Sequence, residues 1–332
     1  MGMKEFAVCG LGNAIVDIFV EVSEAEFAGL GFERGTMRLV DPAEQRALLA
    51  KLHARDPRLV SGGSVANSVI ALSQLGGRAA FIGCVGDDRY GLHYQEEFEH
   101  LGIAMGNPVI FDQVTGTCAC LITPDAERTM RTCLAVASHL GAAHVEEDRI
   151  RNAEWLFIEG YVFANPETGQ GAIREAVRLA RKHGTKVAVT CSDAFVVAVF
   201  GNAFFEALGQ ADLLFCNAAE ACAVTGVATP GEAFEHLKSV VSAAVVTDGP
   251  HGAYVRYAGV EAHVAAYPSE PKDLTGAGDM FAGAFLYGIT NGVPPATAAR
   301  AANFLASKVI AQVGARLHHG AKQYWEQGVA KV

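Results

Sequence analysis

The sequence predicts an α/β fold in which a central, mostly parallel β-sheet carries helices on both faces, together with a small separate β-sheet. Three observations support this fold class. Strand-like apolar runs alternate with segments of helical length along most of the 332 residues. The alternation breaks once, after Gly102, where the pattern changes to period two. Apolar residues make up 51% of the chain, with abundant Gly and Ala, which suits helices packed closely on a parallel sheet.

The first elements in order are a strand and two helices. Residues Phe6–Val22 are expected to form a strand that starts in a core and extends outward. A helix should begin at Asp41, an N-cap followed by proline, and continue to Ala54. Another should begin at Ser64, after a glycine pair, and end at a second glycine pair. Next we expect the strand Ala79–Val85, the helix Tyr90–Leu101, and short antiparallel strands at Val109–Phe111, Thr117–Thr123 and Arg128–Leu134.

Regular alternation resumes in the second half. The expected strands are Trp155–Glu159, Lys186–Thr190, Leu213–Cys216 and Ala243–Thr247, followed by a hairpin-like pair, Gly252–Tyr257 and Val260–Ala265. The expected helices are Glu167–Lys182, Ala194–Leu208, Ala218–Thr225, Gly231–Ser239, Gly278–Thr290, Pro294–Gln312 and one around Ala321–Gly328. Ligands of such folds gather at the carboxyl ends of the parallel strands, so we expect the site there.

Charge and hydropathy exclude several classes of partner. The net charge is −10 and no long Lys or Arg run exists, which argues against nucleic acid. The apolar N-terminus is interrupted by Asn13 and Asp17 and lacks a cleavage site, so it is read as a strand and not a signal peptide. No apolar window of about 20 residues predicts a membrane span. Eight cysteines without a C-x-x-C pair argue against a metal site and a disulfide framework, and predict buried thiols in the cytoplasm.

One stretch, Lys272–Asn291, carries the chemistry. Its small-residue turn, Gly276–Gly278, can bring three backbone N–H groups to one point at the start of a buried helix, where anions bind. Asp279 is itself an anion there, which suits a proton acceptor beside a phosphoryl group in transfer. The alternative is structural, because an Asp in the first turn also caps a helix.

Two other stretches supply candidate binding groups. On a continuous strand, Asn13 and Asp17 would share one face, and Gly10 and Gly12 beside them favour a binding role over a surface role. A second glycine pair, Gly62–Gly63, allows a ligand close to the backbone, with Asn67 one turn into the helix that follows.

Four segments stand in order along the chain. They are SGGSVANSVIALSQLGGRAAFIGCVGDDRYG, the N-x-x-E segment Asn217–Glu220, the T-x-G-x-x-G segment Thr247–Gly252, and DLTGAGDMFAGAF. Together they resemble the PfkB family of ribokinase-like sugar and nucleoside kinases. The resemblance implies one ribokinase-like domain over 1–332 with a β-sheet lid formed by about 14–40 and 104–134.

The resemblance also implies roles for residues at the phosphates. Asp279 would be the general base, and Gly276, Ala277 and Gly278 the anion hole. Asn217 and Glu220 would organise Mg²⁺ through its waters, although the same pair is equally well explained as a helix N-cap with its capping box. The nucleotide would contact Thr247, Gly249, Gly252 and Asn303. Asp273, Thr275, Val309, Gln312 and Gly314 match positions that hold a monovalent cation, such as K⁺, in some members. Leu274 replaces a small polar residue of the signature.

Two further segments indicate which substrate accepts the phosphoryl group. GNAIVDI resembles the GNPLLDI of adenosine kinases, in which the Asn and Asp serve the ribose, and TGTCACLITPDAERTM resembles their TGTCA segment. By this resemblance the sugar would be fixed by Asn13, Asp17, Gly62, Gly63, Ser64 and Asn67, and the base would contact Met37, Cys118 and Tyr161. Arg128 matches an arginine that swings toward the phosphates. Ala14 in place of Pro, and Tyr161-Val162 in place of an aromatic pair, depart from that pattern.

The sequence therefore predicts ATP- and Mg²⁺-dependent phosphorylation of a primary hydroxyl on a ribose-containing substrate, with adenosine preferred. A ribokinase, fructokinase or 2-keto-3-deoxygluconate kinase is the second expectation, and a non-catalytic nucleotide sensor is a third of another class. The expected partners are small molecules, and the chain is expected to be a monomer or a homodimer, which exposed lid strands could form.

Overall fold

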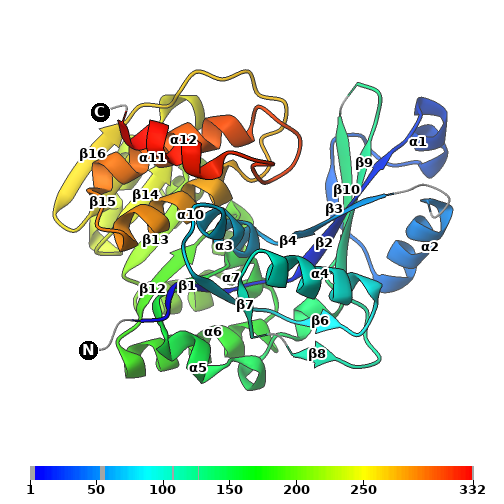
Figure 1. Cartoon of the computed structure of the whole chain (residues 1–332), viewed down its shortest axis with the longest axis horizontal. Coiled ribbons are helices and arrows are strands. Elements are labelled where there is room, and N and C mark those ends of the chain that lie inside the picture. The colour runs from blue at the N-terminus through cyan, green and yellow to red at the C-terminus, as the bar shows by residue number, and fades with distance from the viewer. Residues whose placement is uncertain (1–3, 53–56, 107, 126, 331–332) are drawn as a thin grey trace.

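A nine-stranded sheet lies at the centre of the larger part of the molecule (Figure 1). The computed structural model describes residues 4–52, 57–106, 108–125 and 127–330; the expected helix residues His53 and Ala54, and Asn107 and Ala126 of the expected lid, lie outside these ranges. In spatial order the strands are β16 (Val260–Val264), β15 (Ala253–Tyr257), β14 (Ala244–Thr247), β13 (Leu213–Asn217), β12 (Lys186–Thr190), β11 (Ala153–Ile158), β1 (Phe6–Leu11), β5 (Ala79–Ile82) and β7 (Ala104–Met105).

The strands from β14 to β7 are parallel to their neighbours, and only the β14–β15–β16 edge is antiparallel. The carboxyl ends of seven strands therefore lie along one edge of this large sheet. The fold class predicted from the sequence, a mostly parallel sheet plus a small sheet, is confirmed.

A second, five-stranded sheet projects beside the first. Its order is β3 (Met37–Leu39), β10 (Arg128–Cys133), β9 (Gly116–Ile122), β2 (Ile15–Glu21) and β4 (Arg58–Gly62). We call it the small sheet. Helices α1 (Glu24–Leu30) and α2 (Pro42–Leu52) cover its outer face, where Phe27 and Leu48 pack on Ile18 and Leu121 (Figure 1).

Helices cover both faces of the large sheet (Figure 1). One face packs against α3 (Ser64–Gln74), α10 (Ala277–Thr290), α11 (Pro295–Val309) and α12 (Ala321–Ala330). The other packs against α6 (Gly169–His183), α7 (Ala194–Leu208), α8 (Ala218–Thr225) and α9 (Pro230–His236). Two more helices are α4 (Arg89–His100) and α5 (Glu147–Arg151), and a two-stranded ribbon joins β6 (Val85–Gly86) to β8 (Val109–Ile110).

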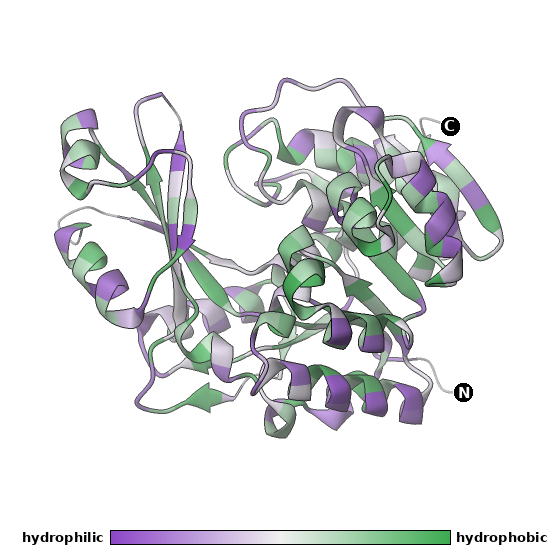
Figure 2. Ribbon diagram, turned by 180° about the vertical axis from the view of Figure 1, so that it is seen from behind, coloured by the Kyte–Doolittle hydropathy of each residue, from purple (hydrophilic) through white to green (hydrophobic). Residues whose placement is uncertain are grey.

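The alternation of side chains along the central strands explains the two cores. In β1, Val8 belongs to the core under α3 and α10, whereas Cys9 and Leu11 belong to the core under α6 and α7. Both faces of each central strand are therefore apolar, as in sheets covered on two sides, and Figure 2 shows the large sheet as hydrophobic between more polar helices. No helix in the described ranges is long and apolar enough to cross a bilayer.

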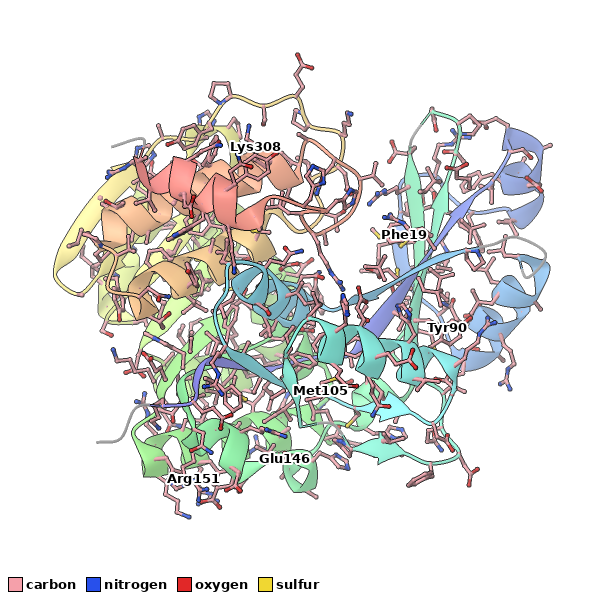
Figure 3. All side chains as sticks on the ribbon, viewed as in Figure 1. Phe19, Tyr90, Met105, Glu146, Arg151 and Lys308 are labelled. Carbon is pink, nitrogen blue, oxygen red and sulfur yellow. The ribbon has the colours of Figure 1, made fainter. Side chains whose placement is uncertain are left out.

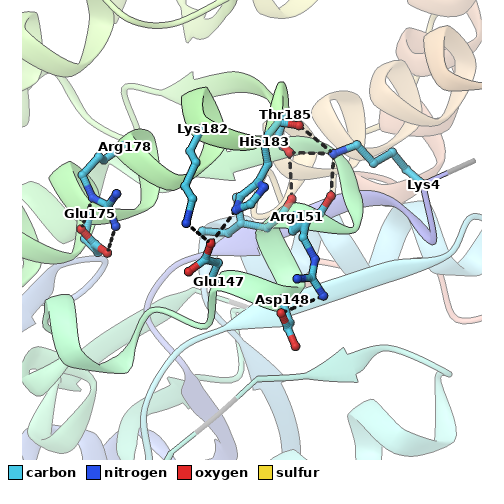
Figure 4. Close-up of polar contacts among 10 residues, drawn as sticks. Lys4, Glu147, Asp148, Arg151, Glu175, Arg178, Lys182, His183 and Thr185 are labelled. Atoms are coloured by element: carbon cyan, nitrogen blue, oxygen red, sulfur yellow. Dashed lines mark hydrogen bonds and ion pairs between the residues drawn. The ribbon is translucent and has the colours of Figure 1, made fainter. Parts of the chain in front are cut away.

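Polar contacts tie the N-terminal residues to α5 and α6 near the amino ends of β1 and β12, at the edge of the large sheet opposite the carboxyl ends (Figure 4). The Lys4 ammonium donates to the Arg151 carbonyl at 2.5 Å and to the Thr185 hydroxyl at 3.2 Å. Hydrogen bonds from Lys182 and His183 lower the pKa of Glu147 to about 2. These exposed pairs are expected to contribute little to stability.

The structure corrects several details of the predicted elements. The expected strand Phe6–Val22 is two strands, β1 in the large sheet and β2 in the small one, so Asn13 lies in the connection and does not share a strand face with Asp17. The expected lid strand at Val109–Phe111 is β8, which pairs with β6 outside the small sheet. The short β4, which ends at the first residue of the glycine pair, Gly62, was not predicted and completes the small sheet.

Candidate active site

The expected site residues gather at the carboxyl edge of the large sheet. A cavity of about 170 Å³ lies there, lined by residues that end strands, among them Thr190, Asn217 and Thr247, and by the first turns of two helices, which contribute Ser64, Gly278 and Asp279. This is the edge at which parallel α/β sheets bind ligands.

Two helices begin at this cavity without a capping side chain. The N-cap of α3 is Gly63 and that of α10 is Gly276, and neither offers a side-chain acceptor to the free N–H groups. Gly63 has φ +108°, and a Cβ atom there would lie 2.1 Å from the Asn13 carbonyl oxygen, so only glycine fits. Gly283 lets α10 approach the Ser68 carbonyl of α3, which holds the two helix starts together.

Asp279 lies in the first turn of α10 and receives two hydrogen bonds from α3. The Ser64 hydroxyl donates to its Oδ1 at 2.7 Å, and the Asn67 amide donates to its Oδ2 at 3.1 Å. Burial raises the pKa of Asp279 to about 6, while these two hydrogen bonds lower it. The carboxylate is therefore largely ionised at neutral pH, yet basic enough to accept a proton.

The backbone beside Asp279 offers N–H groups to an anion. Ala277 N–H donates weakly to the Leu274 carbonyl at 3.3 Å, whereas Gly276 and Gly278 N–H groups make no hydrogen bond within the described residues. Gly276 takes the left-handed conformation, with φ +79°. Free N–H groups at a helix start attract negative charge, so this turn can stabilise a phosphoryl oxygen.

Asn217 and Glu220 form a complete capping box at the start of α8. Asn217 Oδ1 accepts from Glu220 N–H at 2.9 Å, and Glu220 Oε2 accepts from Asn217 N–H at 2.9 Å. The structural explanation considered for this pair is therefore confirmed. Burial, helped by the charges of Asp193 and Asp279, raises the pKa of Glu220 to about 7. A buried carboxylate among other acids, lining the cavity, is a suitable neighbour for a hydrated Mg²⁺.

A second cavity of about 610 Å³ adjoins the first and shares Thr247, Gly278 and Phe281 with it. Gly249, Gly252 and Asn303, expected at the nucleotide, also line this second cavity. Its wall is mainly apolar, from Tyr267, Pro268, Ala306, Ile310 and neighbouring residues. The Asn303 amide donates to the Ala265 carbonyl at 3.1 Å and is thereby fixed in the wall. A small cavity of mixed polar and apolar lining thus adjoins a larger, mainly apolar one at Gly278, and the two are suited to phosphates and a flat base respectively.

Asp17 faces this region from the small sheet. Burial raises the pKa of Asp17 to about 7, against the lowering effect of Arg316 and Arg128. In the register of β2 and β9, Asp17 is opposite Cys118, and Phe19 is opposite Cys120. These side chains share one face, which we call the inner face of the small sheet; Figure 3 shows Phe19 on the side of that sheet toward the rest of the molecule.

The residues expected at the base are spread around this region. Cys118 is buried on the inner face, and Met37 is opposite Met130 on the edge strand β3, with 49% of its surface exposed. Tyr161 lies in the 3₁₀ turn Gly160–Ala164, with its ring 6.2 Å from that of Phe195. The three side chains therefore come from three separate elements.

Glu159 is a polar residue of the site that the sequence motifs did not indicate. It follows β11 and is 1% exposed. Its carboxylate accepts from the Asn13 amide at 2.8 Å and from Val65 N–H at 3.2 Å. Burial raises the pKa of Glu159 to about 7. Glu159 thereby fixes Asn13, whose Oδ1 has no partner within the described residues, beside the start of α3. Its signal was an acid directly after a buried strand.

Arg128 reaches from β10 to the loop before α10. Its guanidinium contacts the Asp273 carboxylate at 2.6 Å, and both side chains are largely buried. Asp273 also accepts from the Thr275 hydroxyl at 2.7 Å and from Gly314 N–H at 2.7 Å. Two backbone hydrogen bonds add to these contacts. Lys272 N–H donates to the carbonyl of Ile310, which is next to Val309, and Gln312 N–H donates to the carbonyl of Val309. The residues matched to a monovalent cation site therefore lie close together here. Both carboxylate oxygens of Asp273 are already engaged.

Arg316 links three parts of the molecule near Asp17. It contacts Glu97 of α4 at 2.8 Å, and Glu97 accepts from Ser61 N–H of β4 at 2.8 Å. Two guanidinium nitrogens of Arg316 and one of Arg128 are buried without a hydrogen-bond partner among the described residues. Unpaired cationic donors of this kind are available to an anionic or polyhydroxylated ligand.

Comparisons with known proteins agree with this geometry. A family model described as pfkB family carbohydrate kinase matches residues 36–319. The chain is 27% identical over 327 residues to the adenosine kinase of Saccharomyces cerevisiae, covering 92% of this chain and 94% of that one. A probable sugar kinase from Rhizobium etli superposes with a TM-score of 0.88 at 29% identity, covering 98% and 100% of the two chains. The adenosine kinase of Sinorhizobium meliloti superposes with a TM-score of 0.86 at 30% identity, covering 97% of this chain and 99% of that one. The likeness therefore extends over both sheets.

Proposed function

The chain belongs to the pfkB family of carbohydrate kinases, and from this premise we propose that it transfers the terminal phosphoryl group of ATP to the 5′-hydroxyl of adenosine. Family membership makes it a phosphotransferase with an alcohol acceptor and implies ATP as the donor. The observation that carries the proposal is the position of Asp279. Held by Ser64 and Asn67, it lines the first cavity next to Gly278, a residue that both cavities share, and lies beside free N–H groups.

The proposed reaction has Asp279 as general base. It accepts the proton of the acceptor hydroxyl while the acceptor oxygen bonds to the terminal phosphorus and the bond to the bridging oxygen of ADP breaks. The N–H groups of Gly276 and Gly278, and Ala277 after a small adjustment, stabilise charge on the transferred group. The pKa of about 6 supports this assignment, because such a base is ionised at neutral pH without being too weak.

Charge at the phosphates is assigned to the capping box and its surroundings. When bound, Mg²⁺ supplies positive charge that offsets the charge of the phosphate oxygens. We assign Asn217 and Glu220 to its hydration shell, with their mutual hydrogen bonds holding both side chains in position. Thr247, Gly249 and Gly252 would contact the phosphates, and Asn303 would lie near the base of the nucleotide. We also propose that a monovalent cation binds beside Asp273, held by backbone carbonyls.

The acceptor is assigned to the space between the small sheet and α3. Asp17, Asn13 and Asn67 would bind the sugar hydroxyls together with Gly62, Gly63 and Ser64, and Met37, Cys118 and Tyr161 would contact the base. We propose that the small sheet acts as a lid that excludes water, so that the acceptor hydroxyl and not solvent is phosphorylated. Arg128, already bound to Asp273, would close the site near the phosphates.

A second candidate acceptor is a sugar or sugar acid. It is favoured by the unpaired guanidinium nitrogens of Arg128 and Arg316, which are better matched by a carboxylate than by a neutral purine. A similar solved structure is described as a probable sugar kinase. This candidate keeps Asp279 as base and changes only the acceptor side.

Adenosine and its competitors are separated by one assay. ADP release with Mg²⁺-ATP is measured against adenosine, inosine, guanosine, ribose, fructose and 2-keto-3-deoxygluconate. We expect the highest kcat/KM with adenosine. A higher value with the sugar acid would transfer the proposal to the second candidate, and no turnover with any of the six would contradict both.

A further inference from the structure

Three metal-binding side chains meet on the inner face of the small sheet. Cys118 and Cys120 are two residues apart on β9, so both point to the same face, and Asp17 is opposite Cys118 on β2. The two sulfur atoms are 3.7 Å apart, and the sulfur atoms and a carboxylate oxygen of Asp17 all lie within 4.8 Å of one another. The sequence argued against a metal site because C-x-x-C is absent, but a strand brings C-x-C together equally well.

The sulfur separation matches a tetrahedral ion. With Zn–S bonds of about 2.3 Å at the tetrahedral angle, the two sulfurs of a zinc site lie about 3.8 Å apart. A disulfide instead requires about 2.05 Å, and alternate residues of a strand hold their Cα atoms near the upper limit of roughly 6.8 Å for such a bond. The pair is thus positioned for an ion between the sulfurs and not for a bond between them.

The surroundings suit thiolate ligands. The Thr132 hydroxyl donates to Cys118 Sγ at 3.2 Å, the kind of outer contact that orients a metal ligand. Two thiolates and one carboxylate around a divalent ion leave one negative charge. The Arg128 guanidinium lies 5.3 Å from the Phe19 ring, and Phe19 is opposite Cys120, so a compensating charge is close. Thiolate ligands select Zn²⁺ over the Mg²⁺ that a kinase uses.

We propose that Asp17, Cys118 and Cys120 form a Zn²⁺ site, with water in the fourth position, and that Zn²⁺ bound there excludes the acceptor. Binding releases the two thiol protons to solvent. The inhibitory part rests on the proposed function, because Asp17 is assigned there to the acceptor sugar. Zn²⁺ therefore competes with the acceptor and not with ATP, because ATP is assigned to the two cavities at the edge of the large sheet, which Asp17, Cys118 and Cys120 do not line.

Binding is tested first without turnover. Co²⁺, a spectroscopic substitute for Zn²⁺, is added to the full chain and the thiolate-to-cobalt charge-transfer band is followed. We expect one ion per chain, displacement by Zn²⁺, and loss of the band in Cys120→Ser. Cys222→Ser, which removes a partly exposed thiol on α8, is the matched control and keeps the band. No band in the wild-type chain, or a band lost in Cys222→Ser and kept in Cys120→Ser, overturns the site.

Competition is tested second. Acceptor added to the Co²⁺-loaded chain should remove the band, and Zn²⁺ should raise the KM for acceptor while leaving the KM for ATP unchanged. In Cys120→Ser the Zn²⁺ concentration for half inhibition should rise by about tenfold or more, whatever its turnover without Zn²⁺. A band that acceptor does not alter overturns the competition. Failure of the proposed function is distinguished by the assay with Mg²⁺-ATP and without Zn²⁺, in which adenosine and the sugars would all be inactive while the band persisted.

Discussion

Asp279 is held between opposing influences on its pKa. Burial favours the protonated form, and the donors Ser64 and Asn67 favour the ionised form, giving a pKa of about 6. Each donor comes from the first turns of α3, so the acidity of the proposed base depends on a neighbouring helix.

The first prediction concerns the proposed base. In Asp279→Ala we expect kcat to fall by roughly 10²- to 10⁴-fold, the usual contribution of a general base, with the ATP dissociation constant nearly unchanged. Steady-state kinetics and calorimetric ATP titration measure the two quantities. Asp148→Ala, which removes an exposed acid of α5, is the control. Turnover of Asp279→Ala within about tenfold of the wild type would exclude the assigned role.

A second prediction concerns Asn67. Because its amide donates to the ionised carboxylate, Asn67→Ala raises the pKa of Asp279, and the acidic limb of the pH profile of kcat/KM moves to higher pH. The ratio of kcat/KM at pH 8 to that at pH 6 should increase by up to about fivefold. Ser73→Ala, later on the same helix, should leave the ratio unaltered. An unshifted limb in Asn67→Ala would mean that another group limits the profile.

At the scale of elements, the start of α3 is the most constrained point of the site. Gly63→Ala would place a methyl group against the Asn13 carbonyl in a backbone conformation that alanine avoids, and should cost roughly 3 kcal/mol of unfolding free energy. Denaturant titration measures this. The matched control is Gly171→Ala on α6, where a Cβ meets nothing within 4 Å and the change should stay within about 1 kcal/mol. Equal stabilities for both variants would contradict this account.

The same scale shows how far the sequence predicts the structure. The alternation of short apolar runs with longer helical segments located the parallel strands and their helices. Each parallel strand is buried on two faces, so its residues form a continuous apolar run. β4 escaped prediction because Arg58–Gly62 is short and gains its identity only by pairing with β2. β8 was assigned to the wrong sheet because period two reports a strand and not its partner.

In the candidate site too, features set by neighbouring residues could be predicted and features that depend on distant residues could not. A glycine turn followed by an acid at a helix start indicated Asp279, because all of these residues are neighbours in the sequence. This part of the site could therefore be predicted. Glu159 had only the weak signal of an acid after a buried strand, and its role could not be predicted because it depends on Asn13 and Val65, which are far away in sequence. Nor could the two contacts of Asp273 Oδ2, which come from Arg128 of the small sheet and Gly314 of the C-terminal loop.

At the scale of the whole molecule, Arg128 joins the small sheet to the loop before α10. In Arg128→Ala we expect turnover to fall by about 10- to 100-fold and amide hydrogen exchange in β9 and β10 to accelerate, because the ion pair with Asp273 is lost. Arg34→Ala is the control, since Arg34 pairs with the exposed Glu24 and Asp125 beside the same sheet. If both variants behaved alike, Arg128 would have only a local role.

The pH dependence of stability also belongs to the whole molecule. A buried Asp279 with a pKa of about 6, against 3.8 unfolded, stabilises the fold fully below pH 3.8 and loses that contribution as the pH rises through 6. Between pH 5 and pH 8 the loss is on the order of 1 kcal/mol. This loss is absent in Asp279→Asn. The difference between the Tm at pH 8 and the Tm at pH 5 should therefore be about 2 °C more positive in Asp279→Asn than in the wild type. An unchanged difference, measured by scanning calorimetry, would contradict the raised pKa.

The contact of Gly63 with Asn13 marks a place where two segments cross side by side from the large sheet to the small one. Such a crossing can serve as a pivot, with the seven residues of β2 as the arm beyond it. At about 3.3 Å per residue the arm is roughly 23 Å long, so a rotation of only about 5° at the pivot displaces its tip by about 2 Å. We therefore expect a ligand bound at Asn13 to change the position of residues at the far end of the small sheet without touching them.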